Sequence, residues 1–180
     1  MGILTYIIRT YSPFTPIPFI LLSIALSRWW DIINNALSDL GHPSNSIGAI
    51  IFNSGLVLGG YLMAVQSALI LKYTKSLESL LISIIGLSLI LVGTINESFG
   101  YAHFVVSVIL FIVLATYVTY STIAYKIPWL VIGLTTSILL WYLHFTQGIP
   151  RGAAIPELVS IATTYVAYLT CTFRKVVYVR

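Results

Sequence analysis

Long apolar runs separated by short polar stretches restrict the fold of this chain more than any other feature. The run from Tyr101 to Tyr125 contains no lysine, arginine, aspartate or glutamate. A helix of about 20 apolar residues crosses the hydrocarbon core of a bilayer. Because 58% of the 180 residues are hydrophobic and only 8% are charged, a soluble domain of this size would be unable to bury its apolar surface. We therefore predict a multi-pass integral protein of the cell membrane.

The apolar runs predict an all-α bundle of about six transmembrane helices. The expected spans are residues 12–30, 46–71, 77–95, 101–125, 128–147 and 155–173. Pro13, Pro16 and Pro18 fall in the first turns of the first span, where a missing N–H group costs little. Six spans of about 20 residues leave only short connections, so we expect residues 1–180 to form a single transmembrane domain.

The distribution of cations predicts that both termini are cytoplasmic. With six spans, Arg28 and Arg151 lie on one side of the membrane. The other seven of the nine cations lie on the opposite side: Arg9, Lys72, Lys75, Lys126, Arg174, Lys175 and Arg180. Cytoplasmic loops are enriched in lysine and arginine. Since these cations stand between apolar runs and form no basic patch, we expect membrane lipids as partners and no nucleic acid.

Two glycines four residues apart, Gly55 and Gly59, lie in the second expected span. Small residues at this spacing allow two helix backbones to approach closely, and such contacts drive helix association in lipid. We expect this pair to pack against another helix of the same chain, with dimerisation as the lesser alternative.

Most acids and all histidines lie on the side opposite to the cations. The ligand-binding candidates on this outer side are Asp39, His42, Asn53, Glu97, His103 and His144. A charged group at membrane depth costs about 2.5–3.5 kcal/mol on insertion scales, so such groups face the bundle interior or one another. One interpretation is a shared polar pocket. The other is that these residues cap helix ends near water and act separately.

The polar residues indicate no specific reaction. Three histidines and a carboxylate are the ligand types of a zinc hydrolase, but Gly41-His42-Pro43 is typical of a turn and no zinc-binding helix motif is present. We assign no metal or cofactor, and the single cysteine, Cys171, excludes a disulfide within the chain. No nucleophile-elbow motif marks a catalytic serine. Whether the protein is an enzyme is left open.

Three stretches together resemble a known prokaryotic family. They are Asn35-Ala-Leu-Ser38-Asp39-Leu40-Gly41, Phe52-Asn53-Ser-Gly55-Leu56, and Gly93-Thr-Ile-Asn-Glu97 followed by His103. The chain is similar over nearly its whole length to the six-helix membrane family catalogued as domain of unknown function nine hundred and ninety-eight. The resemblance implies that Ser38, Asp39, Gly41, Asn53, Glu97 and His103 are the characteristic polar positions. Ile95-Asn96 stands where that family usually has Phe-Pro. The resemblance implies no known activity.

Two functions fit these observations. In the first, a polar pocket on the extracytoplasmic face binds a lipid headgroup, an ion or a small ligand. In the second, the chain is a non-catalytic accessory subunit of a larger membrane complex, and its polar loops dock on partner subunits. We expect Asp39, Glu97 and His103 to form one coupled site and Asn53 to face the bundle interior, because an amide exposed to hydrocarbon leaves its hydrogen bonds unmade.

Overall fold

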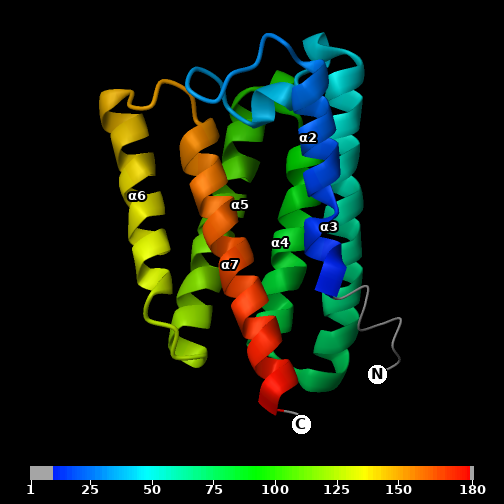
Figure 1. Ribbon diagram of the computed structural model, residues 1–180. Coiled ribbons are helices and arrows are strands. Elements are labelled where there is room, and N and C mark those ends of the chain that lie inside the picture. Colours follow the sequence, from blue (N-terminus) through cyan, green and yellow to red (C-terminus); the bar gives the residue numbers. More distant parts are fainter. Residues whose placement is uncertain (1–9, 179–180) are drawn as a thin grey trace. The chain divides into compact units, whose positions relative to one another are not determined.

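The described part of the protein is all-α. The structure is a computed structural model that describes residues 10–178, with side chains over residues 10–172. Within these residues there are six α-helices and no strand (Figure 1). The helices are α2 (Pro16–Leu26), α3 (Ile47–Thr74), α4 (Leu77–Thr94), α5 (Tyr101–Ala124), α6 (Leu130–Gln147) and α7 (Ala154–Tyr178). Short 3-10 turns connect them: η1 (Ser12–Phe14), η2 (Ser38–Gly41), η3 (Pro43–Asn45) and η4 (Glu97–Phe99). The all-α prediction is confirmed.

Five of these helices, α3 to α7, are long and apolar enough to cross a membrane. Their beginnings and ends lie within three residues of the expected spans, except that α7 extends to Tyr178. The multi-pass character is therefore confirmed. The orientation of the termini stays a prediction. Of the cations that support it, Arg9 and Arg180 lie outside the described residues, and the side chains of Arg174 and Lys175 are likewise outside the described part.

The first expected span, residues 12–30, is longer than the helix that forms. The apolar helix runs from Ser12 to Leu26, which corresponds to about 22 Å against a hydrocarbon core of about 30 Å. It ends because Ser27 leaves the helical conformation and donates its hydroxyl hydrogen to Asn45 Oδ1, at 2.9 Å. Trp29 Nε1 donates to the same oxygen at 3.2 Å. The residues up to Trp30 therefore belong to the connection to α3.

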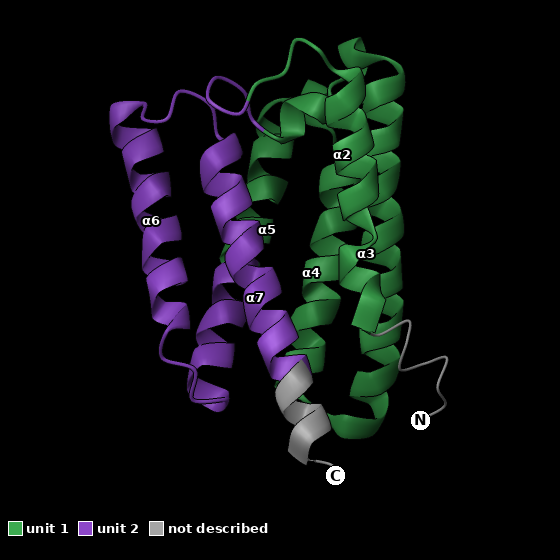
Figure 2. Cartoon of the chain, in the orientation of Figure 1, with its two compact units in different colours: residues 1–31, 37–113 green, residues 32–36, 114–180 purple. Residues whose placement is uncertain are grey.

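The chain divides into two compact units (Figure 2). Unit 1 comprises Met1–Asp31 and Leu37–Val113, and unit 2 comprises Ile32–Ala36 and Leu114–Arg180. The boundary falls inside α5, so a single helix contributes to both units. The expectation of one transmembrane domain stays a prediction.

Unit 1 is built on the hairpin of α3 and α4, whose backbones touch. A Cβ added at Gly86 would lie 2.6 Å from the Ala64 nitrogen and 2.6 Å from the Gly60 carbonyl oxygen. One turn away, Ser83 Oγ donates to the Ala64 carbonyl at 3.2 Å. Small residues thus permit the close approach that stabilises helix pairs in lipid.

The glycine pair of α3 contacts α2. A Cβ at Gly55 would overlap Phe19, and a Cβ at Gly59 would overlap the ring of Pro16. Both contacts lie within unit 1, so the structure places this glycine pair at an interface between helices of the same chain.

Unit 2 is organised by α6 and α7, which pack against each other. A Cβ at Gly133 would lie 2.6 Å from the Thr163 side chain, and Trp141 Nε1 donates to Ser160 Oγ at 3.2 Å. The loop between these helices holds residues 32–36, since Gly152 N donates to Ile33 O at 2.8 Å and Ala154 N donates to Asn35 O at 3.0 Å.

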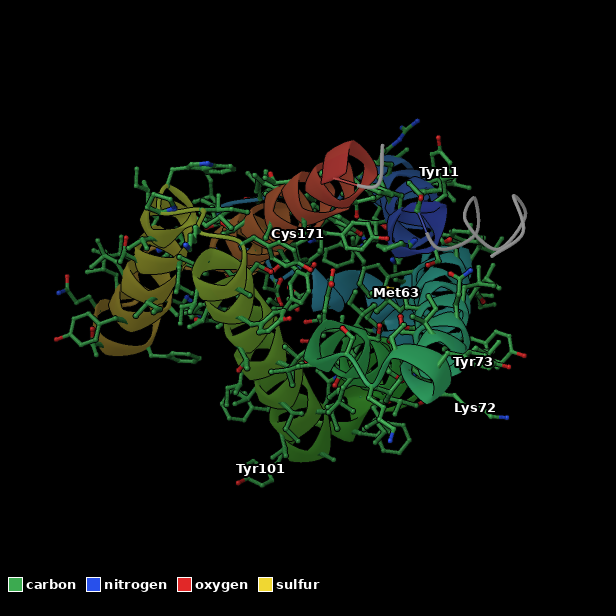
Figure 3. All side chains as sticks on the ribbon, turned by 90° about the horizontal axis from the view of Figure 1, so that it is seen from below. Tyr11, Met63, Lys72, Tyr73, Tyr101 and Cys171 are labelled. Carbon is green, nitrogen blue, oxygen red and sulfur yellow. The ribbon has the colours of Figure 1, made fainter. Side chains whose placement is uncertain are left out.

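Exposed tyrosines mark the two ends of unit 1. Tyr101, at the start of α5, and Tyr73, near the end of α3, are each 81% exposed, and Figure 3 shows both projecting away from the helices, with Lys72 beside Tyr73. Aromatic residues concentrate at membrane–water interfaces. Because α3 has 28 residues, it spans about 42 Å, which matches a bilayer with its headgroups.

Candidate functional site

The turn η2 is fixed to α3 at the end of unit 1 where α3 and α5 begin. Asn53, in the second turn of α3, donates from Nδ2 to the carbonyl of Gly41 at 2.9 Å. A Cβ at Gly41 would lie 2.6 Å from Asn53 Oδ1, so a larger residue at position 41 would displace this amide. Asn53 therefore faces the first loop and not the lipid.

A second amide, Asn45, connects the same loop to the end of α2. Its Oδ1 accepts hydrogen bonds from Ser27 and Trp29, and its Nδ2 donates to the Leu40 carbonyl at 2.8 Å. A Cβ at Gly48 would overlap this amide. Asn45 is not among the predicted site residues, although an asparagine in a loop rich in turn residues is a signal for such a role.

The two acidic candidates of unit 1 are on neighbouring turns. Asp39 lies in η2 and Glu97 lies in η4, and these two 3-10 turns are in contact. Both residues are half-buried, and Oε2 of Glu97 is shielded from solvent. The acidic positions of the two turns therefore lie at the same end of unit 1.

His103 lies in the first turn of α5 and is 7% exposed. Its Nδ1 is 2.6 Å from the Ile95 carbonyl oxygen. Because a carbonyl only accepts hydrogen bonds, we assign the proton to Nδ1. Nε2 of the neutral ring is then an acceptor, and it lies 3.3 Å from Ser107 Oγ. His103 thus connects the end of α4 to α5.

The other two histidines have different surroundings. His42 Nδ1 accepts from the Ser44 backbone N–H at 3.2 Å, which places the proton of its neutral ring on Nε2. His144 belongs to unit 2, where its Nδ1 lies 2.9 Å from the Pro150 carbonyl. The structure thus brings Asp39, Asn53, Glu97 and His103 to one end of unit 1, whereas His144 is part of α6.

No cluster for a metal ion is found in the part of the chain that the structure describes. No group of three or more histidine, cysteine, aspartate or glutamate side chains within it is arranged to hold one. The zinc-hydrolase alternative therefore has no geometric support within these residues.

Sequence reasoning missed several polar groups. Ser107 was not singled out, although it lies four residues after His103 and hence on the same helix face. Glu78, in the first turn of α4, is 2% exposed, and Glu157, in the first turn of α7, is 6% exposed. Both lie near predicted span ends, and only tertiary packing shows that they are buried.

Comparison with known proteins gives one match. The family model described as "Protein of unknown function (DUF998)" matches residues 12–174. No curated protein and no solved structure matches the chain.

Proposed function

Given that the chain belongs to this family of unknown function, we propose that it is an integral membrane protein whose η2/η4 end binds a positively charged group of a polar ligand. We define the η2/η4 site as Asp39, Asn53, Glu97 and His103. On the predicted topology this site faces the extracytoplasmic side, where it is accessible to a lipid headgroup, an ion or a small ligand.

The contact between η2 and η4 is the observation that carries the proposal. The turns that carry Asp39 and Glu97 meet at the end of unit 1 where Asn53 and His103 fix the surrounding backbone. Carboxylates accept hydrogen bonds and carry negative charge, so the complementary ligand supplies donors and positive charge.

An amine is the ligand group that we favour. The ethanolamine headgroup of a phospholipid has an ammonium group at the depth of the helix ends, and a free amine offers the same group from water. These two sources share one chemistry, and the experiment separates them from each other and from a metal cation.

Binding measured on the full-length chain in lipid nanodiscs tests the proposal. Native mass spectrometry is expected to show retention of phosphatidylethanolamine over phosphatidylglycerol. Because a lost charge-assisted hydrogen bond costs about 1.5–3 kcal/mol, Asp39→Asn and Glu97→Gln should each weaken retention about tenfold or more. Titration with ethanolamine and with Ca²⁺ in place of the lipid distinguishes a free amine and a metal cation.

Asp31→Asn provides the control, since Asp31 is an exposed acid that precedes the loop segment carrying η2. It should leave lipid retention unchanged. Equal loss in all three variants, or no preference among lipids and cations, would contradict the proposed site. Purification with a stoichiometric partner chain would instead favour the accessory-subunit alternative.

A further inference from the structure

Three groups at the η2/η4 end lie in the order that nucleophilic catalysis requires. The Ile95 carbonyl is 2.6 Å from Nδ1 of His103, and Nε2 of the same ring is 3.3 Å from the Ser107 hydroxyl oxygen. The carbonyl fixes the proton on Nδ1, so Nε2 carries the lone pair that accepts a hydrogen bond from the hydroxyl. An activated serine typically has its hydroxyl within hydrogen-bond distance of a base, and a third group orients that base. The distance between hydroxyl and base is often longer when no ligand is bound.

The position of the Ser107 hydroxyl differs from that of many other helical hydroxyls in this chain. Thr119, Thr122, Ser137 and Thr163 each donate to the carbonyl four residues earlier, at 2.8 Å. This back-bonding is the ordinary way to satisfy a hydroxyl within an apolar helix. Ser107 has its own such carbonyl on His103, yet its oxygen lies against the imidazole.

We propose that Ser107 is the nucleophile and His103 the general base of an acyl-transfer site that hydrolyses a carboxylic ester. The inference rests on the proposed function, because the carboxylates of the η2/η4 site would hold the polar part of the substrate. The Ser107 oxygen bonds to the ester carbonyl carbon while its proton passes to His103 Nε2. The ester C–O bond breaks, and the alcohol leaves with that proton. Water then attacks the acyl-serine carbonyl, passes its proton through Nε2 to Ser107, and releases the carboxylic acid.

The depth of Ser107 indicates which esters are accessible. It follows Tyr101 by six residues in α5, which places it about 9 Å along the helix axis from the interfacial end. The headgroup layer of one leaflet is about 5–8 Å thick. Ser107 therefore lies near the level at which the acyl ester carbonyls of a phospholipid meet the hydrocarbon. The substrate class is an acyl ester of a membrane lipid.

A fluorophosphonate probe tests the inference, because it modifies activated serine hydroxyls covalently. The full-length protein in nanodiscs is expected to carry the label on Ser107, identified by peptide mass spectrometry, and Ser107→Ala should lose it. His103→Asn should reduce labelling at least tenfold while the unfolding temperature is kept, since the asparagine amide replaces the Nδ1–H donor toward Ile95 but lacks Nε2. Ser98→Ala is the matched control. The Ser98 hydroxyl lies at the same end of unit 1 and bonds to Asn96 at 2.7 Å, so its removal should leave labelling unchanged.

A second readout does not depend on the folding of the His103 variants. In Ser107→Cys the thiol is within reach of the same base, so iodoacetamide should alkylate it faster than the cysteine of Ser98→Cys, despite the greater exposure of position 98. The native Cys171 is buried and replaced by alanine in both proteins. Slower alkylation at position 107, or no fluorophosphonate label on folded wild-type protein, would overturn the inference.

Lipid turnover tests the substrate class and separates this inference from the proposed function. The rate of fatty-acid release from nanodisc phospholipid should exceed the rate of hydrolysis of a water-soluble short-chain ester. Faster hydrolysis of the soluble ester would exclude a lipid ester as the substrate. Ser107→Ala should abolish labelling and turnover but leave amine binding unchanged. If Asp39→Asn leaves amine binding intact, the proposed binding site is wrong even where Ser107 is labelled.

Discussion

At the scale of single residues, the Asn53 amide holds the first loop in place. Its hydrogen bond to the Gly41 carbonyl, at 2.9 Å, joins α3 to η2, the turn that carries Asp39. In Asn53→Leu the carbonyl loses its donor in a partly buried place, at a cost of about 1–3 kcal/mol. We expect normal membrane insertion and a lower unfolding temperature in detergent. Ser54→Leu changes the neighbouring exposed position and should unfold like the wild type. Equal unfolding temperatures for the Asn53 variant and the wild type would show that the bond is not important for stability.

Part of the site was predictable from residue types alone. Asp39, Asn53, Glu97 and His103 were identified because polar residues are rare in this chain and collect on the side opposite to the cations. The partner of His103 was not predictable, because a backbone carbonyl is present at every position and only the turn through η4 brings Ile95 to the imidazole. Ser107 was overlooked for a related reason: serine is common in these helices, and its orientation depends on a contact that no spacing rule specifies.

At the scale of helices, the α3–α4 pair depends on glycine at position 86. A Cβ there would meet backbone atoms of Ala64 and Gly60, which cannot rotate away. A Cβ at Gly133 would meet the Thr163 side chain of α7, which can change rotamer. Gly86→Ala should therefore destabilise the protein by about 1–3 kcal/mol, and Gly133→Ala by less. Thermal unfolding of both variants in the same detergent measures the difference. A larger loss of stability in Gly133→Ala than in Gly86→Ala would mean that α3 and α4 separate easily.

The apolar runs predicted the helices well because a bilayer forces every backbone polar group in a span to bond within its own segment. Helix ends follow a different rule. The first helix ends at Leu26, four residues before its expected end, since Ser27 and Trp29 bond to Asn45 on a distant part of the chain. The apolar pattern also did not predict that α5 is divided between the two units. That division depends on tertiary contacts of α5 and not on its own sequence.

At the scale of the whole molecule, the charged loops predict how the chain crosses the membrane. Lys72 and Lys75 lie at the end of α3 and in the turn before α4, whereas η4 carries Glu97 and no cation. Since α4 has 18 residues, about 27 Å separates these two turns, so they lie on opposite sides of a bilayer. The excess of lysine and arginine on one side predicts that the α3–α4 turn is cytoplasmic.

Cysteine labelling in intact cells tests this orientation without using the termini. In a Cys171→Ala background, Ser98→Cys should react with a membrane-impermeant maleimide added outside the cell, and Lys75→Cys should react only after permeabilisation. Both positions are exposed, so unequal reaction reports sidedness and not burial.

A reporter fused to the amino terminus then tests α2 separately. If the short helix Ser12–Leu26 crosses the membrane, both termini are cytoplasmic, as the cation split predicts. If it does not, the amino terminus is outside while Ser98 keeps its external reactivity. Labelling of Lys75→Cys from outside would reverse the predicted topology, and the η2/η4 site would then face the cytoplasm.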